Sequence, residues 1–328
     1  MKRFIKNILI LVIPILLLMY PLDVFLSKEL KKCDKEYLGE VTIWEDIYNS
    51  RMNYDLLIYG TSRAWLHIDP AIIEGGTGLS AYNLGMDGQD FGTIEFRHQQ
   101  VLKYNKAPKV ILFSLDDTTL SKRLGIYLKE QFLPYMLWNN DMEDVFSQYE
   151  GYDKYDCEIP LLRYAGDYKT IRLAIKTALK KKSDEPPYRR KGYRPLPKTW
   201  TKEFDNLLAT LTPDDTSQNI IVNRGLEGMF IKFIAECKQN NIQLVLVYTP
   251  TYYKMDMIRK NMQDVLDLYK KIAEENNVPF LDYSKDPMCS DIKYFYNAAH
   301  LNTFGSQIFS KKLAGDLSKE NILYLHKN

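Results

Sequence analysis

The sequence has few of the residues that mark metal, redox or nucleic-acid chemistry. Its four cysteines are scattered, with no C-x-x-C pair and no histidine at metal-ligand spacing, which argues against zinc and thioredoxin-like sites. The 44 Lys and Arg residues nearly balance the 42 Asp and Glu residues, so the formal net charge of +2 gives no electrostatic footprint for nucleic acid. No internal repeat is visible. We therefore expect no metal, no dissociable cofactor and no nucleic-acid partner, while cysteine spacing leaves one or two disulfides open.

The N-terminus carries one long apolar run. Basic residues in the first six positions precede the nearly continuous run Ile8–Leu22, which Asp23 interrupts. The run matches a signal-peptide core or a short membrane anchor, and no A-x-A-like cleavage site follows it. A buried core helix is less favoured, because Pro14 and an unbroken apolar circumference suit lipid better. We expect an uncleaved anchor over residues 1–26 with a cytoplasmic N-terminus, which places the rest outside the cytoplasm.

Beyond residue 50 the chain alternates strand-like and helix-like segments. Amphipathic helical patterns cover residues 226–237 and 258–272. Five short apolar runs that end in polar or turn residues are typical of strands covered on both faces: Asp55–Gly60, Ser80–Gly85, Lys109–Asp117, Ile242–Pro250 and Val278–Ser284. Strands alternating with helices predict an α/β fold with a mostly parallel sheet and right-handed crossovers.

Two stretches interrupt this alternation. Residues 27–50 read as a polar juxtamembrane linker before a domain at 51–328, and about 121–219 reads as a long insertion within that domain. The basic, proline-rich arm at 176–202 is either a solvated loop or a surface whose arginines and aromatic residues face an anionic polymer or lipid headgroups.

Ser62 follows the first predicted strand at the position where ligands bind in open α/β sheets. A serine on such a turn is either a nucleophile or a helix cap, and a nucleophile needs a base, usually histidine. Of the four histidines, His98 fits the inner face of a helix, His326 is in the tail and His67 is only five residues from Ser62. His300 lies in a predicted loop past the last strand, from which it can reach the turn at Ser62.

Three segments resemble, in order and context, the motif blocks of SGNH/GDSL-type hydrolases: YGTSR (59–63), YNLGMDGQ (82–89) and NAAHLNTFG (297–305). With the expected anchor, the chain looks more specifically like the membrane-anchored SGNH-like proteins that modify cell-wall or exported polysaccharides alongside membrane-bound O-acyltransferases. The resemblance covers residues 54–122 and 219–317. It implies a three-layer α/β/α fold of the flavodoxin-like, SGNH type.

Carried onto this sequence, the resemblance assigns roles to three residues. Ser62 matches the nucleophile, whose own N–H helps to hold the oxyanion, and Gly85 matches the glycine that supplies a second oxyanion N–H. His300 matches the base that takes the Ser62 proton and later protonates the leaving alkoxide. Asn83 and Gln89 lie close enough in sequence to line a pocket. Arg63 either binds an anionic substrate or forms a buried ion pair, the more common role for such an arginine.

Two positions depart from the family pattern. Asn297 stands where the family has the Asp that orients the histidine; its side-chain oxygen can fix the tautomer but supplies no charge. Three alternatives follow: low activity, a Ser-His dyad, or rescue by another carboxylate such as Asp291. Asp116 stands where many relatives have an asparagine oxyanion donor. An ionised Asp116 would repel an oxyanion, so it points elsewhere, is protonated, or the third donor is absent.

The resemblance implies a membrane-anchored, extracytoplasmic serine acyltransferase or esterase that acts on O-acyl groups of an envelope glycopolymer, with a membrane-bound O-acyltransferase as a partner. One alternative is a catalytically silent SGNH-like protein that binds polysaccharide or scaffolds an O-acyltransferase complex. The other is a tethered α/β protein whose Ser62 is only a helix cap.

Overall fold

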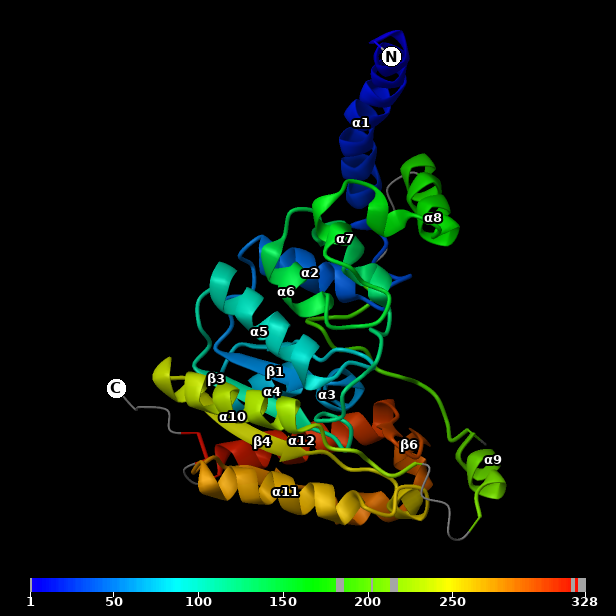
Figure 1. Cartoon of the computed structure of the whole chain (residues 1–328). Coiled ribbons are helices and arrows are strands. Elements are labelled where there is room, and N and C mark those ends of the chain that lie inside the picture. The colour runs from blue at the N-terminus through cyan, green and yellow to red at the C-terminus, as the bar shows by residue number, and fades with distance from the viewer. Residues whose placement is uncertain (1, 181–185, 202, 213–217, 320–321, 324–328) are drawn as a thin grey trace. The chain divides into compact units, whose positions relative to one another are not determined.

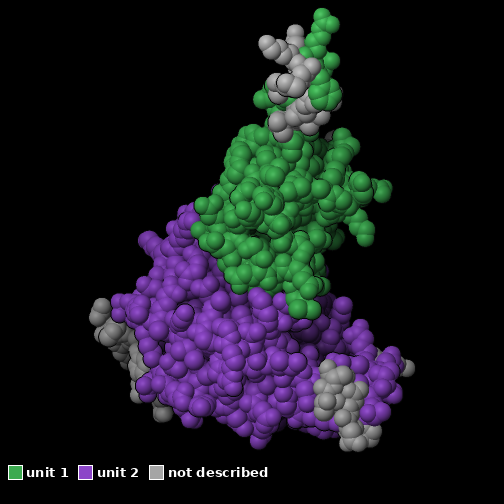
Figure 2. All heavy atoms as spheres, in the orientation of Figure 1, with its two compact units in different colours: residues 1–45, 124–188 green, residues 46–123, 189–328 purple. Residues whose placement is uncertain are grey.

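The computed structural model describes residues 2–180, 186–201, 203–212, 218–319 and 322–323 (Figure 1). The chain divides into two compact units, which are described separately. Unit 1 comprises residues 1–45 and 124–188, and unit 2 comprises residues 46–123 and 189–328 (Figure 2). All four cysteines are buried and free, so neither of the disulfides left open by the spacing is present. The predicted domain boundaries and the insertion at about 121–219 stay predictions.

Unit 1 is helical. Its elements are α1 (Lys2–Leu30), the start of α2 (Glu40–Tyr48), α6 (Asn140–Phe146), α7 (Tyr155–Glu158), α8 (Tyr168–Leu179) and the short 3-10 helices η1 (Lys129–Gln131), η2 (Leu133–Tyr135) and η3 (Leu162–Tyr164). α1 packs against α8 and η2. Its last two turns are fixed by polar contacts as well, because the carboxylate of Asp23 accepts hydrogen bonds from Nη1 and Nη2 of Arg163 at 2.8 and 2.6 Å. Both side chains are 1% exposed, so this is a buried ion pair.

Within the part of the chain that the structure describes, no helix combines the length and the apolar character needed to cross a membrane. The anchor predicted for residues 1–26 falls partly on Met1 and on side chains of α1 that lie outside the described residues. α1 continues past residue 26 to Leu30, and Asp23, which interrupts the apolar run, is a buried contact within unit 1.

Unit 2 is built on a five-stranded parallel sheet in the order β2-β1-β3-β4-β5. The strands are β1 (Leu56–Gly60), β2 (Ala81–Asn83), β3 (Val110–Leu115), β4 (Gln243–Tyr248) and β5 (Phe280–Asp282). Each lies inside one of the five predicted apolar runs, so the α/β class with a parallel sheet is confirmed. The order 2-1-3-4-5 is that of flavodoxin-like sheets, in which ligands bind beyond the carboxyl ends of the strands.

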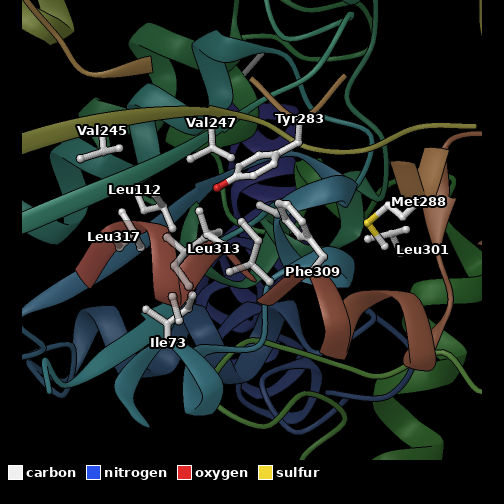
Figure 3. Packing of buried hydrophobic residues seen from close by; sticks show 14 of the residues in the cluster. Ile73, Leu112, Val245, Val247, Tyr283, Met288, Leu301, Phe309, Leu313 and Leu317 are labelled. Atoms are coloured by element: carbon white, nitrogen blue, oxygen red, sulfur yellow. The ribbon is translucent and has the colours of Figure 1, made fainter. Parts of the chain in front are cut away.

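Side chains alternate between two buried faces of this sheet. On one face Ile58, Leu112 and Val247 belong to a cluster that includes Phe309 and Leu313 (Figure 3). On the other face the Phe113 ring lies 6.4 Å from that of Tyr59, and it also contacts aromatic rings of two helices, among them Phe91, Phe230 and Phe233. Because both faces are covered, the central strands are apolar throughout, which is why they read as continuous runs in the sequence.

Unit 2 also contains helices and short 3-10 turns. They are α3 (Ser62–His67), α4 (Pro70–Thr77), α5 (Phe91–Tyr104), α9 (Glu203–Thr210), α10 (Arg224–Gln239), α11 (Met262–Glu275) and α12 (Thr303–Ser318), with 3-10 turns η4 (Tyr253–Met257), η5 (Pro287–Ser290) and η6 (Ile292–Tyr294). Asp90, Asn223 and Asn302 each accept hydrogen bonds from first-turn amides of α5, α10 and α12. A two-stranded antiparallel hairpin, β6 (Phe295–Asn297) and β7 (His300–Leu301), precedes α12.

Part of the predicted basic arm packs inside unit 2. Arg189 is 2% exposed and lies 4.0 Å from the centre of the Trp65 ring. Lys191 pairs with Glu74, and the buried Tyr193 hydroxyl lies 2.7 Å from Ser306 Oγ. A Cβ at Gly192 would meet the Asn83 carbonyl at 1.7 Å, so only glycine fits there. The reading of this part as a polymer- or lipid-facing surface is therefore wrong for the buried Arg189 and Tyr193, and for the other described residues of the arm it stays a prediction; residues 181–185 and 202 lie outside the described part.

Candidate active site

Ser62 stands on a tight turn between β1 and α3. Gly60, the last residue of β1, has φ +137°, a conformation that side-chain-bearing residues rarely adopt, and a Cβ there would meet the Ser114 carbonyl at 2.4 Å. The chain then turns at once into α3, whose first residue is Ser62. Ser62 is half-buried at the carboxyl end of the sheet, so its hydroxyl lies where the sequence predicted it.

Two consecutive carboxylates at the end of β3 hold the residues on either side of Ser62. The Thr61 hydroxyl donates a hydrogen bond to Asp116, and the Arg63 guanidinium pairs with Asp117. Both carboxylates are buried. Asp117 also pairs with Arg259, which follows η4. The Asp-Asp sequence after β3 therefore clamps the Thr-Ser-Arg turn after β1, although no local pattern in either segment indicates it.

The structure shows whether Asp116 is ionised and which groups its carboxylate contacts. Burial raises the pKa of its carboxyl, but the positive charge of Arg63 and the hydrogen bonds from Thr61 and Thr118 outweigh burial and lower the pKa overall. Asp116 Oδ1 accepts further hydrogen bonds from the Thr118 N–H at 2.8 Å and the Thr119 hydroxyl at 3.1 Å. Asp116 is thus ionised with its oxygens turned to these donors, which makes it a support of the serine turn rather than a pocket group or an oxyanion donor.

His300 lies against Ser62. Its Nε2 is 2.8 Å from the Ser62 Oγ, although the two residues are 238 positions apart in the chain. His300 is the first residue of β7, so it is held by a small hairpin and not by the open loop that the sequence predicted. The hairpin fixes the backbone on which the imidazole stands.

Asn297 completes the chain of hydrogen bonds. Its Oδ1 lies 3.0 Å from His300 Nδ1 and also accepts hydrogen bonds from the backbone N–H groups of Ala299 and His300, at 3.1 and 2.9 Å. The two backbone N–H donors identify that atom as the oxygen and not the amide nitrogen, so His300 Nδ1 must be the donor in the third contact. The proton of the neutral imidazole then sits on Nδ1, which leaves the Nε2 lone pair free to accept the Ser62 proton.

Tyr296 is a neighbour of His300 that sequence reasoning missed. Its ring stacks on the imidazole with centroids 5.5 Å apart and planes 12° apart, and its hydroxyl lies 3.3 Å from His300 Nδ1. The aromatic ring holds the imidazole plane from one side. The alternation of aromatic residues in the segment YFYN was the only sequence signal for this contact, and it fits a packed strand equally well.

The surroundings of His300 favour its neutral form. The pKa of His300 is lowered to about 4, chiefly by burial and also by the positive charges of Arg63 and Arg259, against which the charge of Asp116 acts in the raising direction. At neutral pH the imidazole is therefore unprotonated and able to act as a base. The low pKa makes it a weaker base than an ordinary histidine.

The two predicted oxyanion donors, the N–H groups of Ser62 and Gly85, differ in their hydrogen bonds. α3 begins at Ser62, so the Ser62 N–H has no acceptor inside the helix. The Gly85 N–H, by contrast, donates to Asn83 Oδ1 at 2.9 Å, so the structure gives the predicted second donor another partner. Gly85 is required for packing, because a Cβ would lie 2.6 Å from the Trp65 N and 2.9 Å from the Thr61 carbonyl.

Two of the remaining predicted pocket residues, Asn83 and Arg63, have structural partners. Asn83 is fully buried, and its Nδ2 donates to the carbonyls of Ala64 and Ile68, which ties α3 to the end of β2. Gln89 is buried as well. Arg63 is 2% exposed in its ion pair with Asp117, which is the structural one of its two predicted roles.

Asp291, the carboxylate considered as a substitute for the family Asp, has other partners. It accepts a hydrogen bond from the Lys293 N–H at 3.0 Å and pairs with Lys293 Nζ at 2.7 Å. The group on His300 Nδ1 is Asn297, with the Tyr296 hydroxyl beside it. The proposal that Asp291 takes the place of the family Asp is therefore wrong.

Fold and site together define a parallel α/β domain with a serine, a histidine and an asparagine linked by hydrogen bonds beyond the carboxyl ends of its strands. No family model and no curated protein matches the chain. Among solved structures it is similar to an acetyl xylan esterase, with 11% identity, a TM-score of 0.39 and coverage of 80% of this chain and 99% of the other. It is also similar to a GDSL-like lipase from Bacteroides thetaiotaomicron, with 10% identity, a TM-score of 0.38 and coverage of 85% and 98%. These values are too low to assign a function.

Proposed function

We propose that the chain is an SGNH-like serine acyltransferase or esterase that acts on O-acyl groups of a cell-envelope or exported polysaccharide. One observation carries the proposal: Ser62 Oγ lies 2.8 Å from His300 Nε2, while His300 Nδ1 lies 3.0 Å from Asn297 Oδ1. A serine with a neutral, oriented imidazole at hydrogen-bond distance is the arrangement that acyl transfer requires.

The proposed reaction has two halves. In the first, Ser62 Oγ bonds to the acyl carbonyl carbon while its proton passes to His300 Nε2; the carbon–oxygen bond to the alkoxide then breaks, and the alkoxide takes that proton. In the second half, His300 Nε2 removes a proton from a sugar hydroxyl or from water while that oxygen bonds to the acyl carbon. The bond between the acyl carbon and Ser62 Oγ then breaks, and Oγ takes the proton back from His300. The first acceptor gives a transferase and the second an esterase.

The Ser62 N–H is the backbone donor that the proposal assigns to the anionic intermediate. It begins α3 and has no acceptor inside the helix, whereas the Gly85 N–H donates to Asn83. Arg63 and Arg259 lie near the site, but both pair with Asp117.

A cavity of about 430 Å³ supports the choice of a sugar polymer as substrate. It lies past the ends of β4 and β5, and its walls include Tyr252, Tyr253, Asp256, Gln263 and Ser284. Tyrosine rings stack on sugar faces, while carboxylate, amide and hydroxyl groups hydrogen-bond sugar hydroxyls. The volume is within the range of small-ligand sites.

Two contacts connect this cavity to the serine–histidine pair. The Tyr252 N–H donates to the carbonyl of Ala298, two residues before His300, at 2.9 Å. The Tyr248 ring, another wall of the cavity, lies 5.5 Å from the guanidinium of Arg63, the residue after Ser62. Neither Ser62 nor His300 lines the cavity itself, so the proposal requires a polymer that occupies the cavity and extends beyond it to the serine.

Covalent labelling with a fluorophosphonate probe tests the enzyme assignment. We expect folded wild-type protein to be labelled at Ser62, and both Ser62→Ala and heat-unfolded protein to stay unlabelled. His300→Gln should lower the labelling rate by at least about 100-fold, the lower bound for loss of a general base. Wild-type protein that folds and is never labelled would sink the proposal.

The acyl acceptor needs a second assay. An O-acetylated polysaccharide as donor, with an unacetylated one as acceptor, distinguishes free acetate from acetate transferred to sugar. Tyr253→Ala and Asp256→Ala should lower the rate on polysaccharide while leaving the labelling rate by the small probe within about threefold. Equal loss in both assays would contradict the assignment of the cavity to the sugar.

The location and the partner are further parts of the proposal. We propose that the apolar run at Ile8–Leu22 attaches the chain to the membrane with the rest outside the cytoplasm, and that a membrane-bound O-acyltransferase supplies the acyl group. A protease added to intact cells should then cut the arm at 176–202. Full protection of this arm in accessible envelopes would contradict the topology.

A catalytically silent polysaccharide-binding or scaffold protein is the second candidate. It is favoured by the uncharged Asn297 and by the Gly85 N–H that already donates to Asn83. This candidate predicts binding of polysaccharide without labelling of Ser62.

A further inference from the structure

His67 is a fully buried histidine that the proposed reaction does not use. It is the last residue of α3, the short helix that begins with Ser62. Its Nε2 accepts a hydrogen bond from the backbone N–H of Leu301 at 3.0 Å, and its Nδ1 lies 3.1 Å from the Thr249 hydroxyl. One imidazole thus joins the serine helix, the residue after β4 and the strand that carries His300.

These partners fix the tautomer of His67. The Leu301 N–H can only donate, so Nε2 must present a lone pair and the ring proton of the neutral imidazole must be on Nδ1. That proton donates to the Thr249 hydroxyl oxygen. Burial, with the nearby His300 and the charge of Arg63, holds the pKa of His67 well below its usual range, so this neutral form is the one present at neutral pH.

The contact with Leu301 fixes His300 from its C-terminal side. The Leu301 side chain is fully buried in the core cluster near Met288, as Figure 3 shows, so the residue cannot shift without disturbing the core. On the N-terminal side, Asn297 Oδ1 holds the His300 N–H. The two imidazole rings stand edge to face, with centroids 6.1 Å apart.

The backbone of His67 is itself held in place. Its carbonyl accepts a hydrogen bond from Ser310 Oγ at 3.1 Å, and Ser310 Oγ in turn accepts one from the Asp69 N–H at 2.9 Å. Ser310 is buried in α12. The backbone that carries the imidazole is therefore fixed, so the imidazole could not follow the β6–β7 hairpin if the hairpin moved.

We propose that His67 is a positioning residue that sets the distance between Ser62 and His300, through the hydrogen bond from the Leu301 N–H to its Nε2. The inference rests on the proposed function for its effect on acyl transfer, whereas the bond itself can be tested without any activity. Ser62 and His300 lie on different elements, and His67 adds to their own contact a second hydrogen bond between the helix of the first and the strand of the second.

Two substitutions separate positioning from packing. A glutamine side chain reaches the place of Nε2 and can present its oxygen to the Leu301 N–H. An asparagine reaches only the place of Nδ1, so it keeps a contact with Thr249 and loses Leu301. His67→Gln should therefore retain the function that His67→Asn loses. His98→Asn is the matched control, because His98 is equally buried and bonds the Tyr59 hydroxyl on another part of the sheet.

The first readout is amide exchange at Leu301 in folded protein. We expect His67→Asn to speed this exchange at least tenfold relative to wild type, while His67→Gln and His98→Asn stay within threefold. The second readout is the rate of Ser62 labelling by a fluorophosphonate. It should fall about 10- to 100-fold in His67→Asn, which is the loss that a displacement of about 1 Å causes. In His67→Gln and His98→Asn it should stay within threefold of the wild-type rate.

Thr249→Val provides a variant that keeps both His67 and the core volume. It removes the hydroxyl that accepts the Nδ1 proton, so the tautomer with its proton on Nδ1 loses its advantage. In the other tautomer the proton is on Nε2 and points at the Leu301 N–H, so the hydrogen bond from Leu301 is lost. We expect a labelling rate about three- to tenfold below wild type, and this variant replaces His67→Asn if the latter does not fold.

The outcomes are distinguishable. Unchanged Leu301 exchange in His67→Asn and in Thr249→Val would overturn the inference, as would equal losses of labelling in His67→Asn and His98→Asn. Wild-type protein that is not labelled at all would overturn the proposed function and leave the exchange result as the test of the hydrogen bond.

Discussion

Replacing Asn297 with aspartate is the sharpest single perturbation of the site. The change adds one negative charge at an atom 3.0 Å from His300 Nδ1 and alters almost no volume. The Ala299 and His300 N–H groups that now hold Oδ1 can hold a carboxylate oxygen equally well, so the turn should be preserved.

The size of the effect follows from the charge. A carboxylate within about 4–6 Å raises the pKa of a histidine by about 1–3 units, each worth about 1.4 kcal/mol of preference for the imidazolium. The starting pKa is about 4, lowered by burial and by Arg63 and Arg259. Because the site is half-open to solvent, which screens part of the charge, we expect the lower end of this range and about a tenfold higher labelling rate at pH 7.

The pH profile gives the sign of the effect. The base must be neutral, so the labelling rate of wild type should rise through a pH of about 4 and be level above it. In Asn297→Asp the rising limb should move to a pH about one unit higher, the lower end of the range given above. Fluorophosphonate labelling between pH 4 and 9 measures both the limb and the plateau.

A fall in the plateau of more than tenfold in folded Asn297→Asp would refute this reasoning. It would mean that the amide group has a role of its own, such as donating through its nitrogen. Circular dichroism and the midpoint of thermal unfolding provide the check that the variant is folded.

Three further predictions concern stability. Gly85→Ala should lower the free energy of unfolding by about 1–3 kcal/mol and slow Ser62 labelling, because its Cβ would press on the backbone of Thr61 and Trp65; an unchanged denaturation midpoint would contradict this. Asp23→Asn should cost about 3–5 kcal/mol in urea unfolding by leaving Arg163 buried and uncompensated, whereas Asp23→Leu combined with Arg163→Met should be near neutral. Stability should fall as the pH drops from about 6.5 towards 4, since the pKa of the fully buried His98 is about 4 when folded and about 6.5 when unfolded; the loss, up to about 3 kcal/mol, should be smaller in His98→Phe.

The sheet could be predicted from the sequence because its strands are covered on both faces. Leu56–Gly60 and Val110–Leu115 are buried along their whole length, so they stand out as apolar runs between polar turns. The same logic located Ser62, since the residue after a parallel strand lies at the functional end of the sheet. His300 followed from the shortage of histidines and from the motif that contains it.

The details of the site could not be predicted, because they depend on contacts between distant segments. Nothing near Asp116 indicates that it accepts a hydrogen bond from the hydroxyl of Thr61, 55 residues earlier in the chain. The resemblance assigned Gly85 the role of an oxyanion donor, yet its N–H donates a hydrogen bond to the side chain of Asn83, two residues earlier. His67 looked like a residue leaving the serine turn, and only the folded chain brings its ring to the Leu301 N–H.

The ion pair between Asp23 and Arg163 sets a practical limit on shortened forms of the protein. A form that begins shortly before Asp23 removes most of the apolar run and keeps the carboxylate that neutralises Arg163. A form that begins at residue 27, where the apolar run finally ends in the sequence, would leave a guanidinium buried without a counter-charge. The presence of residues 23–26 in a recombinant chain would then decide whether unit 1 folds or aggregates.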